Sequence, residues 1–118
     1  MAKKAFKQVW KSITGTPSES LAGKRYRFVN YDANGDIVVA TAGGVSIGIT
    51  EEPNGIQEPT QVIAQGFMFV EYGGAVVAGT EVEVGTDGKA VALNTGKVAG
   101  IAVVGGAADG DLGTVLLK

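Results

Sequence analysis

The sequence predicts a mainly β fold, a small antiparallel β-barrel or sandwich of about eight short strands. Glycine accounts for 19 of the 118 residues, more than twice its usual share, and the glycines are scattered among Val, Ile and Ala, which is typical of many tight turns. Short apolar or alternating segments recur about every 8–12 residues with turn residues between them. No segment after residue 20 has a convincing helical period.

The expected strands begin at residues 25–31, where polar and apolar side chains alternate. The Asn34-Gly35 pair that follows favours the positive φ values of a hairpin turn, and Asp87-Gly88 gives the same signal later in the chain. Residues 73–79 are ambiguous and are expected to form a loop or a tight bend. The further strands are expected at residues 37–41, 45–50, 61–64, 67–71, 81–84, 90–93, 98–104 and 112–117.

The first sixteen residues have a different rhythm. Phe6, Val9, Trp10 and Ile13 are spaced as i, i+3, i+4 and i+7, which predicts a short helix that ends before Pro17. A helix of this length needs a surface to lie on. That surface is its own domain, a neighbouring subunit or, less favoured, a membrane. The sequence therefore divides into a basic N-terminal arm and linker at residues 1–24 and a β-rich domain at residues 25–118.

Charge is distributed unevenly along the chain. Residues 1–27 hold seven basic residues and one acidic residue, a net charge of +6, whereas residues 28–118 hold three basic and eleven acidic residues, a net charge of −8. An acidic body repels a polyanion such as DNA, so the pattern favours protein contact over nucleic-acid binding. The residues predicted to form this protein interface are Lys3, Lys4, Phe6, Lys7, Val9, Trp10, Lys11 and Ile13.

The composition argues against catalysis and metal binding. There is no Cys and no His, which removes disulfides, thiolate zinc sites, cysteine nucleophiles and the commonest general base. Residues 32–36 resemble the opening of a calcium loop, but Ile37 stands where that loop needs glycine and Gly43 where it needs a carboxylate. We expect no enzyme activity, no catalytic or metal-binding residues and no cofactor.

Neither a signal peptide nor a membrane helix is expected. The leader lacks an apolar core because Lys7 and Lys11 interrupt it. The longest uncharged, mostly apolar run, at residues 98–108, is well below the roughly 18 residues of a membrane helix. The sequence predicts a soluble, unprocessed chain without membrane contact.

Several phrases of the chain resemble one known family. The most specific are VEYGGAVVAGTEV at residues 70–82 and TDGKAV at residues 86–91; YRFV at 26–29, SIGI at 46–49, QVIAQG at 61–66 and VAGIA at 98–102 accompany them. From about residue 26 to residue 118 the chain resembles the small capsid decoration proteins of tailed bacteriophages, also called cement or head-stabilisation proteins. The basic leader lies outside this resemblance.

The resemblance implies a structural virion protein without catalytic residues. Such a protein is made in the cytoplasm of the host bacterium and binds the outer surface of the capsid as a trimer or a threefold cluster. Its partner is the major capsid protein, whose subunits it bridges, and it stabilises the mature head. Two alternatives stay open: another phage structural module such as a tail or fibre component, and a small nucleic-acid-binding or ligand-binding β-barrel.

Overall fold

A computed structural model describes residues 4–52, 55 and 58–118 of the chain. It confirms a mainly β fold built from antiparallel strands. The strands are β1 (Gln8–Gly15), β2 (Phe28–Tyr31), β3 (Ile37–Val39), β4 (Gly48–Glu52), β5 (Thr60–Glu71), β6 (Glu81–Val84), β7 (Ala90–Ala92), β8 (Gly100–Val104) and β9 (Leu112–Leu117). A single 3-10 turn, η1 (Thr86–Gly88), joins β6 to β7. No helix in the described ranges is long and apolar enough to cross a bilayer.

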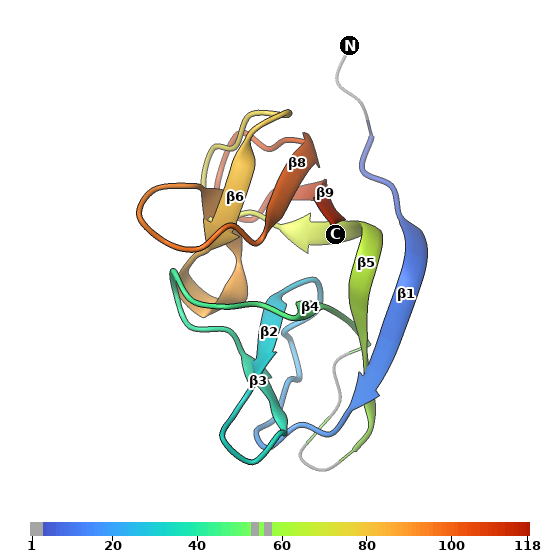
Figure 1. Cartoon of the computed structure of the whole chain (residues 1–118). Coiled ribbons are helices and arrows are strands. Elements are labelled where there is room, and N and C mark those ends of the chain that lie inside the picture. Colours follow the sequence, from blue (N-terminus) through green and yellow to red (C-terminus); the bar gives the residue numbers. More distant parts are fainter. Residues whose placement is uncertain (1–3, 53–54, 56–57) are drawn as a thin grey trace.

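The long strand β5 organises the sheet. The strand order is β3-β2-β4-β5-β9-β8-β6-β7, and β1 pairs with β5 outside this path. The first half of β5 pairs with β4 and β1, and its second half pairs with β9. In Figure 1, β2, β3 and β4 lie at the lower end of the molecule and β6, β8 and β9 at the upper end, with β5 and β1 along one side.

Both ends of the sheet curl back onto the chain. At one end Pro17, just after β1, forms a bridge with Ile37 of β3. At the other end Tyr72, just after β5, forms a bridge with Ala90 of β7. The structure therefore has an N-terminal lobe, formed by β1–β4 and the first half of β5, and a C-terminal lobe, formed by β6–β9 and the second half of β5.

Two clusters of apolar side chains fill the interior. The smaller cluster belongs to the N-terminal lobe and contains Leu21, Val29, Ile37 and Val62. The larger cluster extends through the C-terminal lobe and includes Tyr72. The Tyr72 hydroxyl donates a hydrogen bond to the carbonyl of Val104 at 2.6 Å, and burial raises the pKa of Tyr72 to about 12. The fold thus carries a packed apolar core, and the chain has no cysteine to form a disulfide.

The helix predicted for the leader is wrong in its described part, because Gln8–Gly15 form strand β1. The register against β5 shifts between Val9 and Lys11 and again before Ser12. Such a bulge resets the two-residue alternation of a strand, so its apolar positions imitate the spacing of a helix. Pairing with β5 also satisfies the backbone of a segment too short to be a stable isolated helix.

Gly66 explains both this bulge and a second difference from expectation. The two strands predicted at residues 61–64 and 67–71 are one continuous strand, β5, with Gly66 inside it. Gly66 has a φ of +118°, and a Cβ built on it would lie 2.8 Å from the backbone nitrogen of Trp10 and in collision with the carbonyl oxygen of Gln8. The glycine is needed here because β1 approaches β5 closely at the bulge.

Candidate protein-binding surface

Four strands place one row of side chains on the side of the sheet that faces away from the main core. Glu81 of β6 pairs with Ile101 of β8, Ile101 with Leu116 of β9, and Leu116 with Phe67 of β5. Residues directly opposite one another in an antiparallel pair point to the same face. We call Glu81, Ile101, Leu116 and Phe67 the outer row.

The next residue in each strand confirms which face this is. Each member of the outer row has a neighbour in its strand that is buried in the main core. Val82 follows Glu81, Ala102 follows Ile101, Met68 follows Phe67, and Val115 precedes Leu116. The outer row itself is half-buried or exposed. Three apolar side chains lie in a row on this face, and none of the strands in the described part of the chain covers Ile101 or Leu116, which makes the face a candidate contact surface.

The leader covers one end of the outer row only in part. The rings of Phe6 and Trp10 lie 5.3 Å and 5.5 Å from the ring of Phe67, measured between centroids. Phe6 is fixed by its backbone, whose N–H donates to the Thr114 hydroxyl oxygen at 2.7 Å and whose carbonyl accepts from that hydroxyl at 2.7 Å. Trp10 keeps 57% of its surface exposed. This end therefore presents a protruding, half-free indole.

The other end of the outer row opens into a shallow hollow. Its apolar floor comes from Ile101, Leu116 and Val98, and the charged side chains of Glu81 and Lys118 stand at its border. Val98 is 52% exposed. We call this the outer hollow; Ala99 and Gly100 complete its lining.

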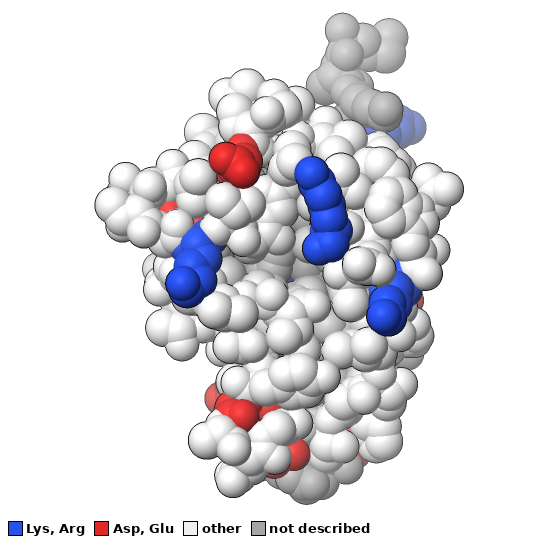
Figure 2. Space-filling view, in the orientation of Figure 1, with Lys and Arg blue, Asp and Glu red and all other residues white. Residues whose placement is uncertain are grey.

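Charged groups are sparse on the corresponding face of the molecule. Figure 2 shows that uncharged atoms predominate over β6 and β8, and that the basic groups stand apart from one another there. Acidic groups gather at the lower end, under the N-terminal lobe. Depletion of charge is the compositional mark of the centre of a protein interface.

The predicted interface residues of the leader fall into two groups. Lys3 lies outside the described residues. Four of the others contact their own domain: Phe6 on Thr114, Lys7 in an ion pair of 2.9 Å with Glu51, Trp10 edge-on against Phe67, and Ile13 against the smaller core cluster.

Of the residues predicted to form the interface, Lys4, Lys7, Val9, Trp10 and Lys11 are exposed. They are available to a partner, and their role as an interface stays a prediction. Sequence reasoning missed the rest of the surface, from Phe67 to the outer hollow. Its signal is the buried and half-buried alternation of β8, which becomes a surface only through pairing with β9 and β6.

A chain of ion pairs joins the two lobes on the side of β5 opposite to the main core. Every carboxylate in it lies between two cations or at its end, with N···O distances of 2.6 to 3.3 Å. The order is Lys24, Asp87, Arg27, Glu71, Lys89, Asp109. The hydrogen bond from Lys24, with help from Arg27, lowers the pKa of Asp87, and the bonds to Asp109 and Glu71 raise the pKa of Lys89.

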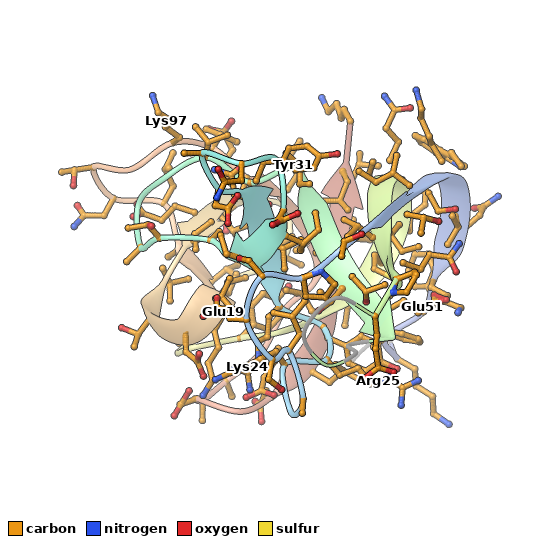
Figure 3. All side chains as sticks on the ribbon, turned by 90° about the horizontal axis from the view of Figure 1, so that it is seen from below. Glu19, Lys24, Arg25, Tyr31, Glu51 and Lys97 are labelled. Atoms are coloured by element: carbon orange, nitrogen blue, oxygen red, sulfur yellow. The ribbon has the colours of Figure 1, made fainter. Side chains whose placement is uncertain are left out.

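A second, smaller set of polar contacts lies at the end of the N-terminal lobe. Seen from below in Figure 3, Lys24, Arg25 and Glu51 lie on the side away from Tyr31 and Lys97. The Arg25 Nε–H donates to the carbonyl of Glu51 at 3.2 Å. Within the described ranges, no group of three or more His, Cys, Asp and Glu side chains could hold a metal ion. These charged groups fix loops to one another.

The comparisons with known proteins concern the fold. No protein-family model and no curated protein matches the chain. A solved structure, "The crystal structure of head fiber gp8.5 N base in bacteriophage phi29", matches with a TM-score of 0.73 and 24% sequence identity. The match covers 92% of this chain and 93% of that one. The chain therefore shares its fold, over nearly its whole length, with the base of a bacteriophage head fiber.

Proposed function

We propose that this chain is a structural protein of a tailed-bacteriophage virion that binds the outer surface of the head, bridges major capsid subunits and stabilises the mature shell. The observation that carries the proposal is the shared fold with a phage head fiber base over 92% of the chain. The resemblance of residues 26–118 to capsid decoration proteins supports it from the sequence. A virion location on the outer capsid surface follows.

The arrangement of the molecule suits a role in contact. The lobes share β5 and are joined by the ion-pair chain, so the body presents a fixed surface. The exposed part of the leader and the outer row supply apolar area with charged groups of both signs at its border, which suits binding to other protein subunits. As for decoration proteins, the partners are the major capsid protein and further copies in a trimer or threefold cluster.

Binding would stabilise the head by mass action. A protein that binds the mature lattice and not its disassembled subunits shifts the equilibrium toward the lattice. Many equivalent positions on one shell multiply this effect. No chemical step is required of the chain.

The test uses heads of the phage that encodes this chain, prepared without the protein. Full-length protein is mixed with them, bound protein is measured by co-sedimentation, and its position is located by electron microscopy. We expect saturable binding, density on the outer surface at threefold positions, and decorated heads that withstand higher temperature. Absence of binding, or density on the tail, would overturn the proposal. Substitutions are preferable to deletion of the leader, because deletion removes strand β1.

A second candidate is the base of a head fiber, which is favoured because the structural neighbour is such a base. The same micrographs separate the two functions. Compact density that ends at the body supports decoration, whereas density that continues outward as a thin shaft supports a fiber base.

A further inference from the structure

Trp10 is a protruding side chain without an intramolecular cover. It is the sole tryptophan of the chain, and it meets Phe67 edge-on at an interplanar angle of 81° while 57% of its surface stays exposed. Its neighbour Val9 is exposed as well. Tryptophan is the residue most enriched at the energetic centres of protein interfaces, where it fills a pocket on the partner.

The basic side chains of this edge strand have a simpler explanation, which does not extend to the tryptophan. Lysines on an edge strand, together with a bulge, prevent uncontrolled pairing with other sheets. Lys11 and the bulge of β1 fit that role, and Lys7 stands just before the strand. A large exposed indole has the opposite effect, because it adds apolar area to the same edge.

The chain itself carries a site that fits this side chain. The outer hollow has an apolar floor of Val98, Ile101 and Leu116. It lies on the same sheet face as Trp10 and extends from Leu116, the cross-strand neighbour of Phe67, toward Glu81. A second copy rotated beside the first brings the indole of one copy over the hollow of the next. Such head-to-tail contacts join two different patches, and they close into a trimer when the rotation between copies is threefold.

Charge supports a second copy as the occupant. Lys11 follows Trp10 and pairs in register with Gln65, two residues before Phe67 of the outer row. Glu81 stands at the border of the hollow and is exposed. Glu81 is the carboxylate and Lys118 the cation at this border. When Trp10 of one copy reaches the hollow of another, Lys11 is therefore placed on the Glu81 side and away from Lys118, which fixes the register of the contact.

We infer that Trp10 of one copy packs into the outer hollow of a second copy, against Val98, Ile101 and Leu116, with Lys11 facing Glu81 across the contact. The inference deepens the proposed function, on which it rests for the expectation that copies cluster on the head. It assigns the contact between copies to the outer face and leaves the other surfaces for the capsid.

The sole tryptophan makes the contact directly measurable. Full-length protein is diluted over a wide concentration range, while its mass is followed by sedimentation and Trp10 by emission wavelength and acrylamide quenching. We expect the emission to move to shorter wavelength and the quenching to fall at the concentration where the mass rises. Val98→Lys, which places a charge in the hollow without touching the indole, is expected to abolish both changes.

Val45 offers a matched control. It is 49% exposed, close to Val98, and it lies before β4 in the other lobe. Val45→Lys introduces the same charge and should leave the assembly and the emission change as in the unmodified protein. Equal loss in both variants would mean that added charge, and not the hollow, is responsible, and would overturn the inference.

The ion pair across the contact has its own test. Lys11→Glu and Glu81→Lys should each weaken association a few-fold, as expected for a partly exposed pair, and the double variant should recover it. Additive losses would overturn the pairing of these two residues.

The result also separates this inference from the proposed function. A protein that stays monomeric with unchanged Trp10 emission at every concentration, yet binds heads, overturns the inference and leaves the function standing. A protein that assembles through the hollow but does not bind heads supports the inference and overturns the proposed function. Val98→Lys assembling like the unmodified protein contradicts the inference in either case.

Discussion

The two faces of the sheet formed by β5, β9, β8 and β6 differ although they share the same strands and the same register. On the inner face Met68 pairs with Val115, and Val115 with Ala102, and all three are buried. One residue away, Phe67 pairs with Leu116, and both side chains belong to the outer row and are half-buried. A shift of a single position along the chain separates side chains that stabilise the fold from side chains available for contact.

The difference teaches how a small domain can carry both roles. Because side chains alternate strictly in a strand, an apolar residue on the outer face need not disturb the packing of the inner face. The outer face of β5 is further graded along its length. It begins with Phe67 beneath Trp10, continues with Phe69, whose ring lies 5.4 Å from that of Tyr26, and ends with Glu71 in the ion-pair chain.

Truncating one residue on each face is the largest test of this comparison. Met68→Ala removes a fully buried side chain and is expected to lower the free energy of unfolding by about 2–5 kcal/mol. Leu116→Ala removes a half-buried side chain beside it and should cost about 1 kcal/mol. Urea unfolding measures both. Equal losses would show that the outer row belongs to the core.

The sequence was sufficient for the fold class and for its turns. Asn34-Gly35 and Asp87-Gly88 were expected to make turns, and Gly35, Asp87 and Gly88 all have positive φ. These signals are local, because a glycine or an aspartate adopts such a backbone for reasons contained in a few residues.

What the sequence could not supply is long-range. The outer row depends on which strands lie side by side, and β9 pairs on one edge with β5, which lies far earlier in the chain. Strand β1 was mistaken for a helix because its bulge changes the phase of its apolar residues. Only the partner strand, with glycine at position 66, makes that bulge possible. The surface therefore appears only when the register is known.

Gly66→Ala is expected to have the next largest effect, since it disturbs the docking of β1, the strand that carries Trp10 to the outer face. A methyl group at this position meets the backbone of β1, and a φ of +118° is unfavourable for alanine. We expect a loss of about 1–3 kcal/mol in unfolding free energy, with Trp10 more accessible to acrylamide at low protein concentration. Gly74→Ala is the control, because nothing lies within 4 Å of the added Cβ. Similar losses in both variants would show that the loss at Gly66 does not come from the contact with β1.

Asp87→Asn tests the polar end of the outer face and should have the smallest effect. The hydrogen bond from Lys24 and the pairing with Arg27 lower the pKa of Asp87 in the folded chain. A carboxyl with a lowered native pKa stabilises the fold above its unfolded pKa, about 3.9, and loses that contribution as the pH falls through the native value. Since 41% of the side chain is exposed, the difference from the unmodified protein should be below about 1 kcal/mol at neutral pH.

The pH dependence of that difference decides whether the ion pair is its cause. Urea unfolding is measured for both proteins from neutral pH down to the acid limit of the native state, and the two curves should converge in acid as Asp87 becomes protonated. Asp36→Asn is the control, because it removes a carboxyl at the hairpin turn of the N-terminal lobe, outside the ion-pair chain. A difference for Asp87→Asn that stays constant across the whole range would mean that the substitution acts on the backbone at φ +60°. The ion pairs of Asp87 would then add nothing to the stability of this end of the sheet. The part of the outer face of β5 that stabilises the fold would in that case end at Phe69 and not include Glu71.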